Sequence, residues 1–137
     1  MQVKEIMTRI VEFASPTTSA KEAAHQMHET HVGVLPVLDE DKVVGMITDR
    51  DICCKVVATG HSAGRTPVSE IMSTEVATCF DDQEISEATD IMIDKHVRRL
   101  AVVNKANHLV GILSVDDVAR DSHDMASSVL ESAAQLH

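Results

Sequence analysis

Aromatic residues are almost absent from this chain of 137 residues, which contains two Phe and no Trp or Tyr. A core must therefore be built from Val, Ile, Leu, Met and Ala. Apolar residues still make up 44% of the chain and charged residues 25%, which is ordinary for a folded globular protein. A chain of this length is the usual size of one domain and is long enough to bury a core.

Long apolar runs are also missing. No run approaches the roughly 18 residues that cross a bilayer, and the N-terminal "MQVKEIMTRI" lacks the apolar region of a signal peptide. The three cysteines, Cys53, Cys54 and Cys79, are an odd number without the spacing of a disulfide framework. We therefore expect a reduced, cytoplasmic protein that makes no membrane contact.

Basic residues are scarce as well. Twelve Lys and Arg stand against 22 Asp and Glu, a formal net charge of −10. Such a surface repels phosphate backbones, so no nucleic-acid partner is expected. A small anionic ligand is still compatible with this charge, because a local basic cluster outweighs the net field at short range.

Catalytic signatures are absent too. The chain has no P-loop, GxGxxG, paired-carboxylate site or catalytic triad, so we expect no enzyme and no catalytic residue. Cys53 and Cys54 lack a partner base, and we interpret them as small buried apolar residues.

Three histidines, His25, His28 and His31, follow a three-residue spacing that is compatible with a zinc site. The later copy of this segment keeps only His96, so no metal is expected. We interpret His31 and His96 as core or interface residues at the ends of their helices.

What the chain does contain is a repeat. "VKEIM" at residues 3–7 returns as "VSEIM" at 68–72, and "KEAAHQMHETHVGVLPV" at 21–37 returns as "SEATDIMIDKHVRRLAV" at 86–102. The offset is 65 residues in both cases. It becomes 66 when "VVGMITDRDI" matches "LVGILSVDDV". The sequence therefore contains two copies of one unit, joined by the loop-like "ATGHSAGRTP".

Each copy predicts the same elements. A short helical turn (3–7, 68–72) precedes a short strand (10–13, 76–79). The next segment has helical periodicity, with Ala20, Ala23, Ala24, Met27 and His31 on one face. Two β-branched runs separated by turn residues then predict paired strands, and a last helix begins at Thr48 or Ser114. In copy two we expect this helix to extend into "MASSVLESAAQL", whose apolar residues predict packing on another surface, such as a partner chain.

These patterns predict an α+β fold, made of two β-α-β-β-α repeats packed through their sheets with pseudo-two-fold symmetry. The expected boundaries are residues 1–60 for repeat 1, 61–67 for a linker, 68–121 for repeat 2 and 122–137 for a helical tail. Because a unit of about 50 residues buries little surface alone, the copies should share a core and form two related clefts.

The motif Gly-h-h-Thr/Ser-x-x-Asp, where h is apolar, ends both copies as "GMITDRD" and "GILSVDD". Together with "IMT"/"IMS", "SAKEA"/"EISEA" and "VGVLPVLD"/"VRRLAVVN", it resembles the CBS domain family, in which a tandem pair is called a Bateman module. The resemblance covers about residues 2–121. It implies a stand-alone, homodimeric regulatory module for an unidentified protein target. The implied ligand is adenosine-containing: AMP, ADP, ATP, NAD or S-adenosylmethionine.

The hydroxyls of Thr48 and Ser114 stand at helix N-termini, where free backbone N–H groups suit a phosphate. Asp51 and Asp117 would repel a phosphate but can accept hydrogen bonds from a ribose diol, and the resemblance implies that role for them. The same pattern is also a capping box with no ligand. Both interpretations stay open at this point.

The other candidate ligand-binding residues follow from the copy comparison. Arg98 and Arg99 replace Gly33 and Val34, and the resemblance implies phosphate contacts for this basic pair; a solvated pair at a strand edge is the alternative. We therefore expect the Asp117 cleft to prefer a phosphorylated ligand. The resemblance also implies apolar contacts with adenine and an approach by the strand of the other copy. The residues concerned are Met46, Ile112, Ile10, Glu12 and Ala77.

A second hypothesis is a structural module that acts through dimerisation alone, with no ligand in its clefts.

Overall fold

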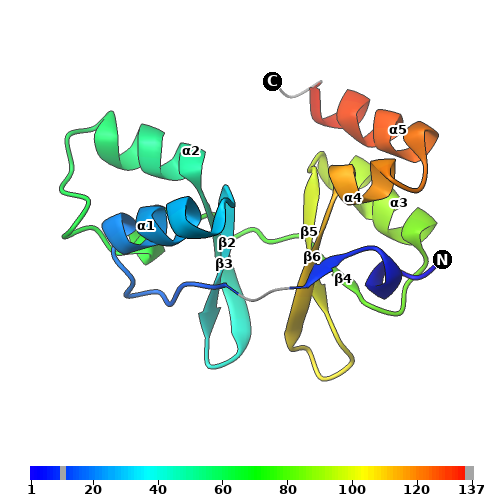
Figure 1. Ribbon diagram of the computed structural model, residues 1–137, viewed down its shortest axis with the longest axis horizontal. Helices are drawn as coiled ribbons and strands as arrows, with labels where there is room; N and C mark the ends of the chain where they lie inside the picture. Colours follow the sequence, from blue (N-terminus) through cyan, green and yellow to red (C-terminus); the bar gives the residue numbers. More distant parts are fainter. Residues whose placement is uncertain (10–11, 135–137) are drawn as a thin grey trace. The chain divides into compact units, whose positions relative to one another are not determined.

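The computed structural model describes residues 1–9 and 12–134. It contains two compact units (Figure 1). The first unit is Val11–Val76, and the second combines Met1–Ile10 with Ala77–His137. Each unit is a small sheet with helices, so the prediction of an α+β protein with two related repeats is confirmed.

The second unit contains a four-stranded sheet in the order β1-β6-β5-β4. Strand β4 (Thr78–Phe80) is parallel to β5 (Arg99–Val103), and β6 (Leu109–Ser114) is antiparallel to both β5 and β1 (Thr8–Arg9). In chain order, the α-helices of this unit are α3 (Ile85–Lys95), between β4 and β5, and α4 (Val115–Ala119) and α5 (His123–Ala134), after β6. Alternate strand residues pack with the helices, namely Leu100, Val102 and Leu113, which join Ala88 and Met92 in one core.

The first unit repeats this plan with shorter flanking strands. Its hairpin pairs β2 (Val34–Asp39) with β3 (Lys42–Thr48). Single bridges from Ala14 to Val37 and from Ser73 to Met46 stand where β4 and β1 stand in the second unit. The helices are α1 (Ala20–Thr30) and α2 (Asp49–Ile52), and α2 continues as a π-helical turn, η2 (Cys53–Val57).

The opening segments of the two repeats are exchanged between the units. The 3₁₀ turn η1 (Val3–Glu5) packs in the second unit, where Val3 N–H donates to Gln83 O (2.9 Å). The matching turn η3 (Val68–Glu70) packs in the first unit, where Val68 N–H donates to Thr18 O (2.8 Å). Both valines are fully buried. Each repeat therefore completes its core with a valine from the other repeat.

This exchange explains the glycine of the Gly-h-h-Thr/Ser-x-x-Asp motif. A Cβ on Gly111 would lie 2.8 Å from Thr8 O and 2.7 Å from Met7 Sδ. A Cβ on Gly45 would lie 2.9 Å from Ser73 O. The exchanged segment passes too close to the strand for any larger residue, so the motif needs glycine for close approach.

The helix ends agree with the sequence in part. Helices α1 and α3 span the predicted segments, and His31 and His96 terminate them in the left-handed conformation (φ 57° in both). His96 is half-buried, but His31 is exposed. The prediction of a core position is therefore wrong for His31, and an interface position for it stays a prediction. Both histidines share the left-handed conformation, so the difference comes from packing: Ser132 of α5 lies against His96, 2.8 Å from its Nδ1.

The predicted continuation of the last helix into the tail is wrong. Helix α4 ends at Ala119, and α5 begins separately at His123. The tail does pack through its apolar residues, as expected, but on its own unit: Ala126 and Val129 belong to the core beside α3 and α4. Ser132 also hydrogen-bonds to His96 and to Ile93 O.

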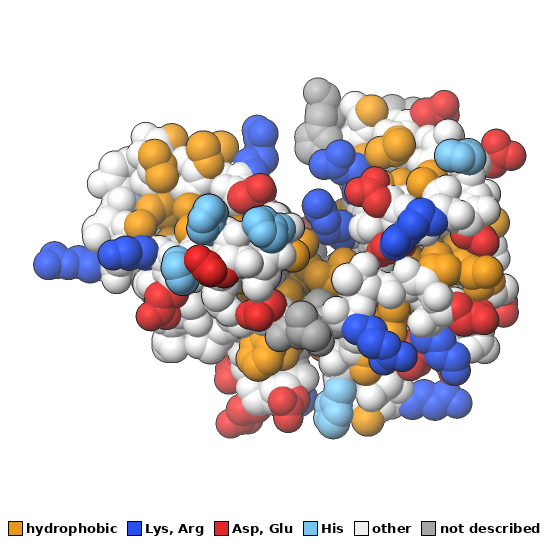
Figure 2. Space-filling model, viewed as in Figure 1, with side chains coloured by type: hydrophobic (Ala, Val, Ile, Leu, Met, Phe, Trp, Pro, Cys, Tyr) orange, Lys and Arg blue, Asp and Glu red, His pale blue; other side chains and the backbone are white. Residues whose placement is uncertain are grey.

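The prediction that Cys53 and Cys54 are buried is also wrong. Both thiols are exposed, as is Val57, whereas Val56 is fully buried. The π-helical turn presents Val56 to the core and leaves its neighbours outside. Figure 2 shows apolar side chains gathered over this helix.

Candidate ligand-binding site

Each predicted aspartate belongs to a complete capping box. In the first unit, Thr48 Oγ1 accepts from Asp51 N–H (3.1 Å), and Asp51 Oδ2 accepts from Thr48 N–H (3.0 Å). In the second unit, the matching distances between Ser114 and Asp117 are 3.2 and 2.9 Å. The capping role is therefore present in both copies. It uses one carboxylate oxygen of each aspartate and leaves the other for a different partner.

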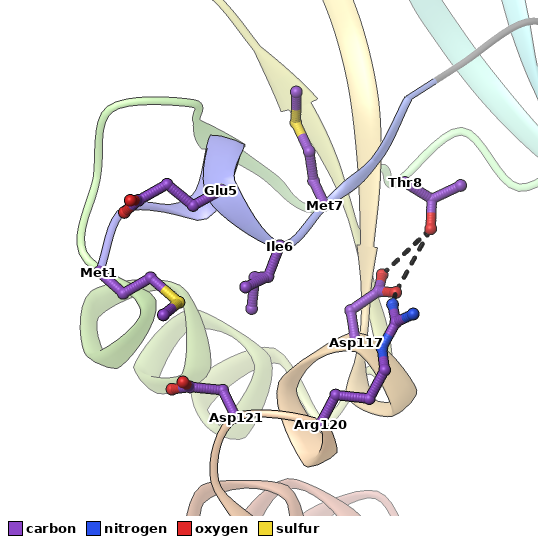
Figure 3. A pocket seen from close by; sticks show the side chains of 8 residues that line it. All are labelled: Met1, Glu5, Ile6, Met7, Thr8, Asp117, Arg120 and Asp121. Atoms are coloured by element: carbon purple, nitrogen blue, oxygen red, sulfur yellow. Dashed lines mark hydrogen bonds and ion pairs between the residues drawn. The ribbon is translucent and has the colours of Figure 1, made fainter.

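The other carboxylate oxygen faces a basic side chain in each unit. Asp117 Oδ1 accepts from Arg120, and it also accepts from Thr8 Oγ1 at 3.3 Å (Figure 3). Asp51 Oδ1 pairs with Lys55 Nζ at 3.2 Å. The Asp117 side chain is 5% exposed and that of Asp51 is 16% exposed. A carboxylate this enclosed needs these partners, because an unpaired buried charge is costly.

A pocket of about 400 Å³ adjoins Asp117 within the second unit. Figure 3 shows Arg120 reaching from just beyond the end of α4 to the carboxylate, with Ile6 and Met1 on the side of η1. The lining combines apolar and ionic groups: Met1, Glu5, Ile6, Met7, Thr8, Asp117, Arg120 and Asp121. The pocket thus offers apolar surface beside a carboxylate and a guanidinium, the mixture that a small polar ligand requires.

Strand register brings several predicted residues to the same capped terminus. Arg99 lies opposite Ser114 in the β5–β6 pair, and Arg98 O accepts from Val115 N–H (2.9 Å). Both arginine side chains are exposed. They are free to contact solvent or a ligand, and the geometry is compatible with both interpretations.

The first unit has the same arrangement without the charges. Val34 lies opposite Thr48, and Gly33 O accepts from Asp49 N–H (3.0 Å). The predicted apolar contacts flank the exchanged segments, since Met46 bridges to Ser73 and Ile112 pairs with Thr8.

Three predicted residues stand apart from these groups. Glu12 lies in the first unit and accepts from Gln26 Nε2 (3.2 Å). Ala77 lies in the second unit, where its carbonyl accepts from Ala101 N–H (3.0 Å). Ile10 falls outside the described residues. Their approach to the clefts of Asp117 and Asp51 stays a prediction.

Three residues that contact the motif aspartates were missed in the sequence: Thr8, Arg120 and Lys55. Thr8 corresponds to Ser73, so a hydroxyl follows "IM" in both copies and was an available signal. Arg120 and Lys55 had no such signal, because the residues at the matching positions of the other copy are Cys54 and Asp121.

Metal and thiol chemistry have little support in the described part of the chain. No group of three or more His, Cys, Asp or Glu side chains there could hold a metal ion. His25 instead lies 3.9 Å from Glu29. Burial raises the pKa of the Cys79 thiol to about 12, which makes its thiolate rare at neutral pH.

Across residues 1–9 and 12–134, no helix combines the length and the apolar character of a membrane span.

The chain belongs to the CBS domain family: the family model matches it twice, over residues 3–57 and 68–124. The CBS domain-containing protein YhcV of Bacillus subtilis is 39% identical over 130 residues, covering 93% of this chain and 91% of that protein. The predicted family resemblance is therefore confirmed, and the tandem pair is a Bateman module.

Solved CBS structures share the fold. The CBS domain pair of protein MJ0100, in complex with 5′-methylthioadenosine and S-adenosyl-L-methionine, superposes with a TM-score of 0.76 at 29% identity, covering 88% of this chain and 94% of that one. CBSX2 in complex with AMP gives a TM-score of 0.73 at 25% identity, with the same coverage of both chains. The chain is thus a CBS-pair regulatory module whose structural neighbours bind adenosyl compounds.

Proposed function

We propose that this protein is a non-catalytic, cytoplasmic sensor of an adenosine-containing ligand, and that it acts as a homodimer on an unidentified protein target. The observation that carries the proposal is the enclosed carboxylate of Asp117, held beside a pocket by Ser114, Thr8 and Arg120. The ligands bound in the MJ0100 and CBSX2 structures support the chemical class. The candidates are AMP, ADP, ATP, NAD and S-adenosylmethionine.

In this proposal the ribose diol donates hydrogen bonds to Asp117. Charge-assisted bonds of this kind are stronger than neutral ones. Asp117 Oδ2 keeps its capping bond to Ser114 N–H, while Oδ1 exchanges its present donors for the ribose hydroxyls. Capping and ligand binding are therefore compatible, because they use different oxygens.

The two repeats should differ in ligand preference. Arg99 lies opposite Ser114, whereas Val34 occupies the matching place opposite Thr48. A guanidinium can bind a phosphate through two parallel bonds. The Asp117 site is therefore proposed as the site for a phosphorylated ligand, and the Asp51 site as the weaker one.

Regulation would follow from differential affinity. A ligand that favours one arrangement of the module shifts its population and so changes a partner-binding surface. No catalytic step is part of this proposal.

A thermal-shift panel with AMP, ADP, ATP, NAD and S-adenosylmethionine tests it. A ligand that binds only the folded state raises the melting temperature by mass action. We expect one of these ligands to do so, and Asp117→Asn to reduce the shift. Asn keeps a side-chain oxygen for the capping bond but loses the charge that attracts the diol. No shift with any ligand at millimolar concentration would contradict the proposal.

The alternative is a dimerisation module without a ligand. It is favoured by the fact that Asp51 and Asp117 each have partners for both carboxylate oxygens within the chain. Under this alternative, the thermal-shift panel stays flat while the dimer persists in sedimentation.

A further inference from the structure

The two repeats place a basic side chain on the motif aspartate from different sequence positions. Arg120 stands three residues after Asp117, whereas Lys55 stands four residues after Asp51. In the aligned repeats, Arg120 matches Cys54, and Lys55 matches Asp121. Both units therefore pair the motif aspartate with a basic side chain, although the basic residues are not at equivalent positions of the two repeats. Because the same contact is made from two different sequence positions, it points to a requirement for a cation at this carboxylate.

Arg120 covers the oxygen that a ligand needs. Asp117 Oδ2 is used in the capping box, so Oδ1 is the acceptor left for a ribose hydroxyl, and Arg120 donates to it. A ligand that binds there must displace the guanidinium. Displacement costs little packing, because the Arg120 side chain is 71% exposed.

The displaced guanidinium then needs a new partner. Among the side chains lining the pocket, Arg120 is the one basic group, and Glu5, Asp117 and Asp121 are acidic. A neutral nucleoside that binds Asp117 displaces the guanidinium of Arg120 and offers it no charged partner, so the guanidinium is left to water. A nucleotide brings a phosphate, which can pair with the guanidinium through charge-assisted hydrogen bonds.

We propose that Arg120 is a further specificity-determining residue of the Asp117 site, in addition to Arg99: it leaves the carboxylate when a ribose binds and pairs with the ligand's phosphate, so the site selects nucleotides over nucleosides. This inference rests on the proposed adenosyl-binding function and adds a residue and a ligand class to it. Without Arg120, the pocket would present three carboxylates and no basic side chain to an incoming anion. A phosphate would then be held less tightly, because Arg99, which is not among these lining residues, would be left as its guanidinium partner.

Lys55 should discriminate less well in the first unit. Its ammonium group also donates to Ile71 O (3.0 Å), in the segment that follows η3. This second bond restrains Lys55, and an ammonium lacks the planar fork of a guanidinium. The inference therefore applies to the Asp117 site.

Calorimetric titration of the full chain with AMP and with adenosine tests the inference. The variants are Arg120→Gln, Arg120→Lys and, as a matched charge control, Lys105→Gln. Lys105 lies in the β5–β6 turn, at the opposite end of the hairpin from Ser114, and pairs with Asp82 at 3.7 Å. Circular dichroism checks that each variant is folded.

We expect the wild type and Lys105→Gln to bind AMP more tightly than adenosine. Arg120→Gln should lose about tenfold in AMP affinity while adenosine affinity holds or rises, and Arg120→Lys should recover part of the AMP preference. A merely structural role would weaken both ligands equally. An unchanged ratio of AMP to adenosine affinity in Arg120→Gln would overturn the inference and leave the proposed function standing. Binding of neither ligand by the wild type, together with a flat thermal-shift panel, would overturn both.

Discussion

Thr8 and Asp117 lie 109 positions apart, and the Thr8 hydroxyl donates to Asp117 Oδ1 at 3.3 Å. Thr8 belongs to the opening segment of repeat one, and Asp117 ends the motif of repeat two. The contact exists because the opening segments are exchanged between the units. The carboxylate that we propose for ribose binding is thus positioned in part by the other repeat.

Thr8→Val should remove this hydrogen bond while keeping the shape of the side chain. We expect a loss of about 1 kcal/mol in the free energy of unfolding, as is typical of one hydrogen bond. Urea denaturation measures it. A double-mutant cycle with Asp117→Asn isolates the pair, and a coupling energy near zero would show that the two residues act independently.

Gly111→Ala should destabilise the second unit by about 1–3 kcal/mol, the range for overpacking. The added methyl group would lie 2.8 Å from Thr8 O, a backbone atom that cannot rotate away as a side chain can. Denaturant unfolding provides the measurement. Gly64→Ala is the control, since its methyl group would meet nothing within 4 Å. Equal stability of Gly111→Ala and the wild type would mean that β1 does not pass β6 this closely.

Thiol labelling should separate the three cysteines. Cys53 and Cys54 are exposed, whereas Cys79 is 3% exposed and its pKa is raised to about 12 by burial. We expect two equivalents of a thiol reagent to react rapidly with native protein at pH 8. The third should react only as the protein unfolds, because the thiolate is the reactive form. Simultaneous reaction of three equivalents would contradict the buried position of Cys79.

Ser132→Ala should loosen α5. Ser132 Oγ lies 2.8 Å from His96 Nδ1 and donates to Ile93 O at 2.8 Å, and the residue is buried. Two hydrogen bonds are lost, although His96 Nδ1 keeps Ser132 O (3.2 Å) and Ile93 O keeps His96 N–H (3.3 Å), so we expect about 1–2 kcal/mol of destabilisation. Amide exchange within α5 should also accelerate.

The exposed Ser128 is the control for this change. Its hydroxyl donates to Asp124 O within the same helix. Ser128→Ala should change the unfolding free energy by less than about 0.5 kcal/mol. Equal effects of the two substitutions would show that the hydrogen bonds of Ser132 to α3 and its C-cap do not stabilise α5.

Local patterns predicted the regular elements well. Helical periodicity placed α1 and α3, and the two β-branched runs of each copy formed the predicted hairpins. Thr48 and Ser114 cap their helices as expected. These features depend on interactions within a few residues, and such interactions can be recognised in a linear sequence.

The errors arose where packing at a distance decides the outcome. Cys53 and Cys54 occupy a helix that a π-helical turn rotates, so their exposure is set by the neighbouring core rather than by their own chemistry. His31 and His96 end their helices in the same left-handed conformation, but His96 is half-buried because Ser132 of α5 packs against it, whereas His31 is exposed. The tail forms a separate helix, and its Ala126 and Val129 pack in the core beside α3 and α4.

The sequence by itself determined that the chain contains two copies of one unit, with a capped helix after each "GMITDRD" and "GILSVDD" segment. The tertiary structure alone decided what each aspartate meets beyond its cap: Thr8 and Arg120 at Asp117, and Lys55 at Asp51. The physical reason is range. A capping box joins residues three apart, whereas Thr8 contacts Asp117 from 109 positions away, in an opening segment whose Val3 is buried in the core of the other repeat.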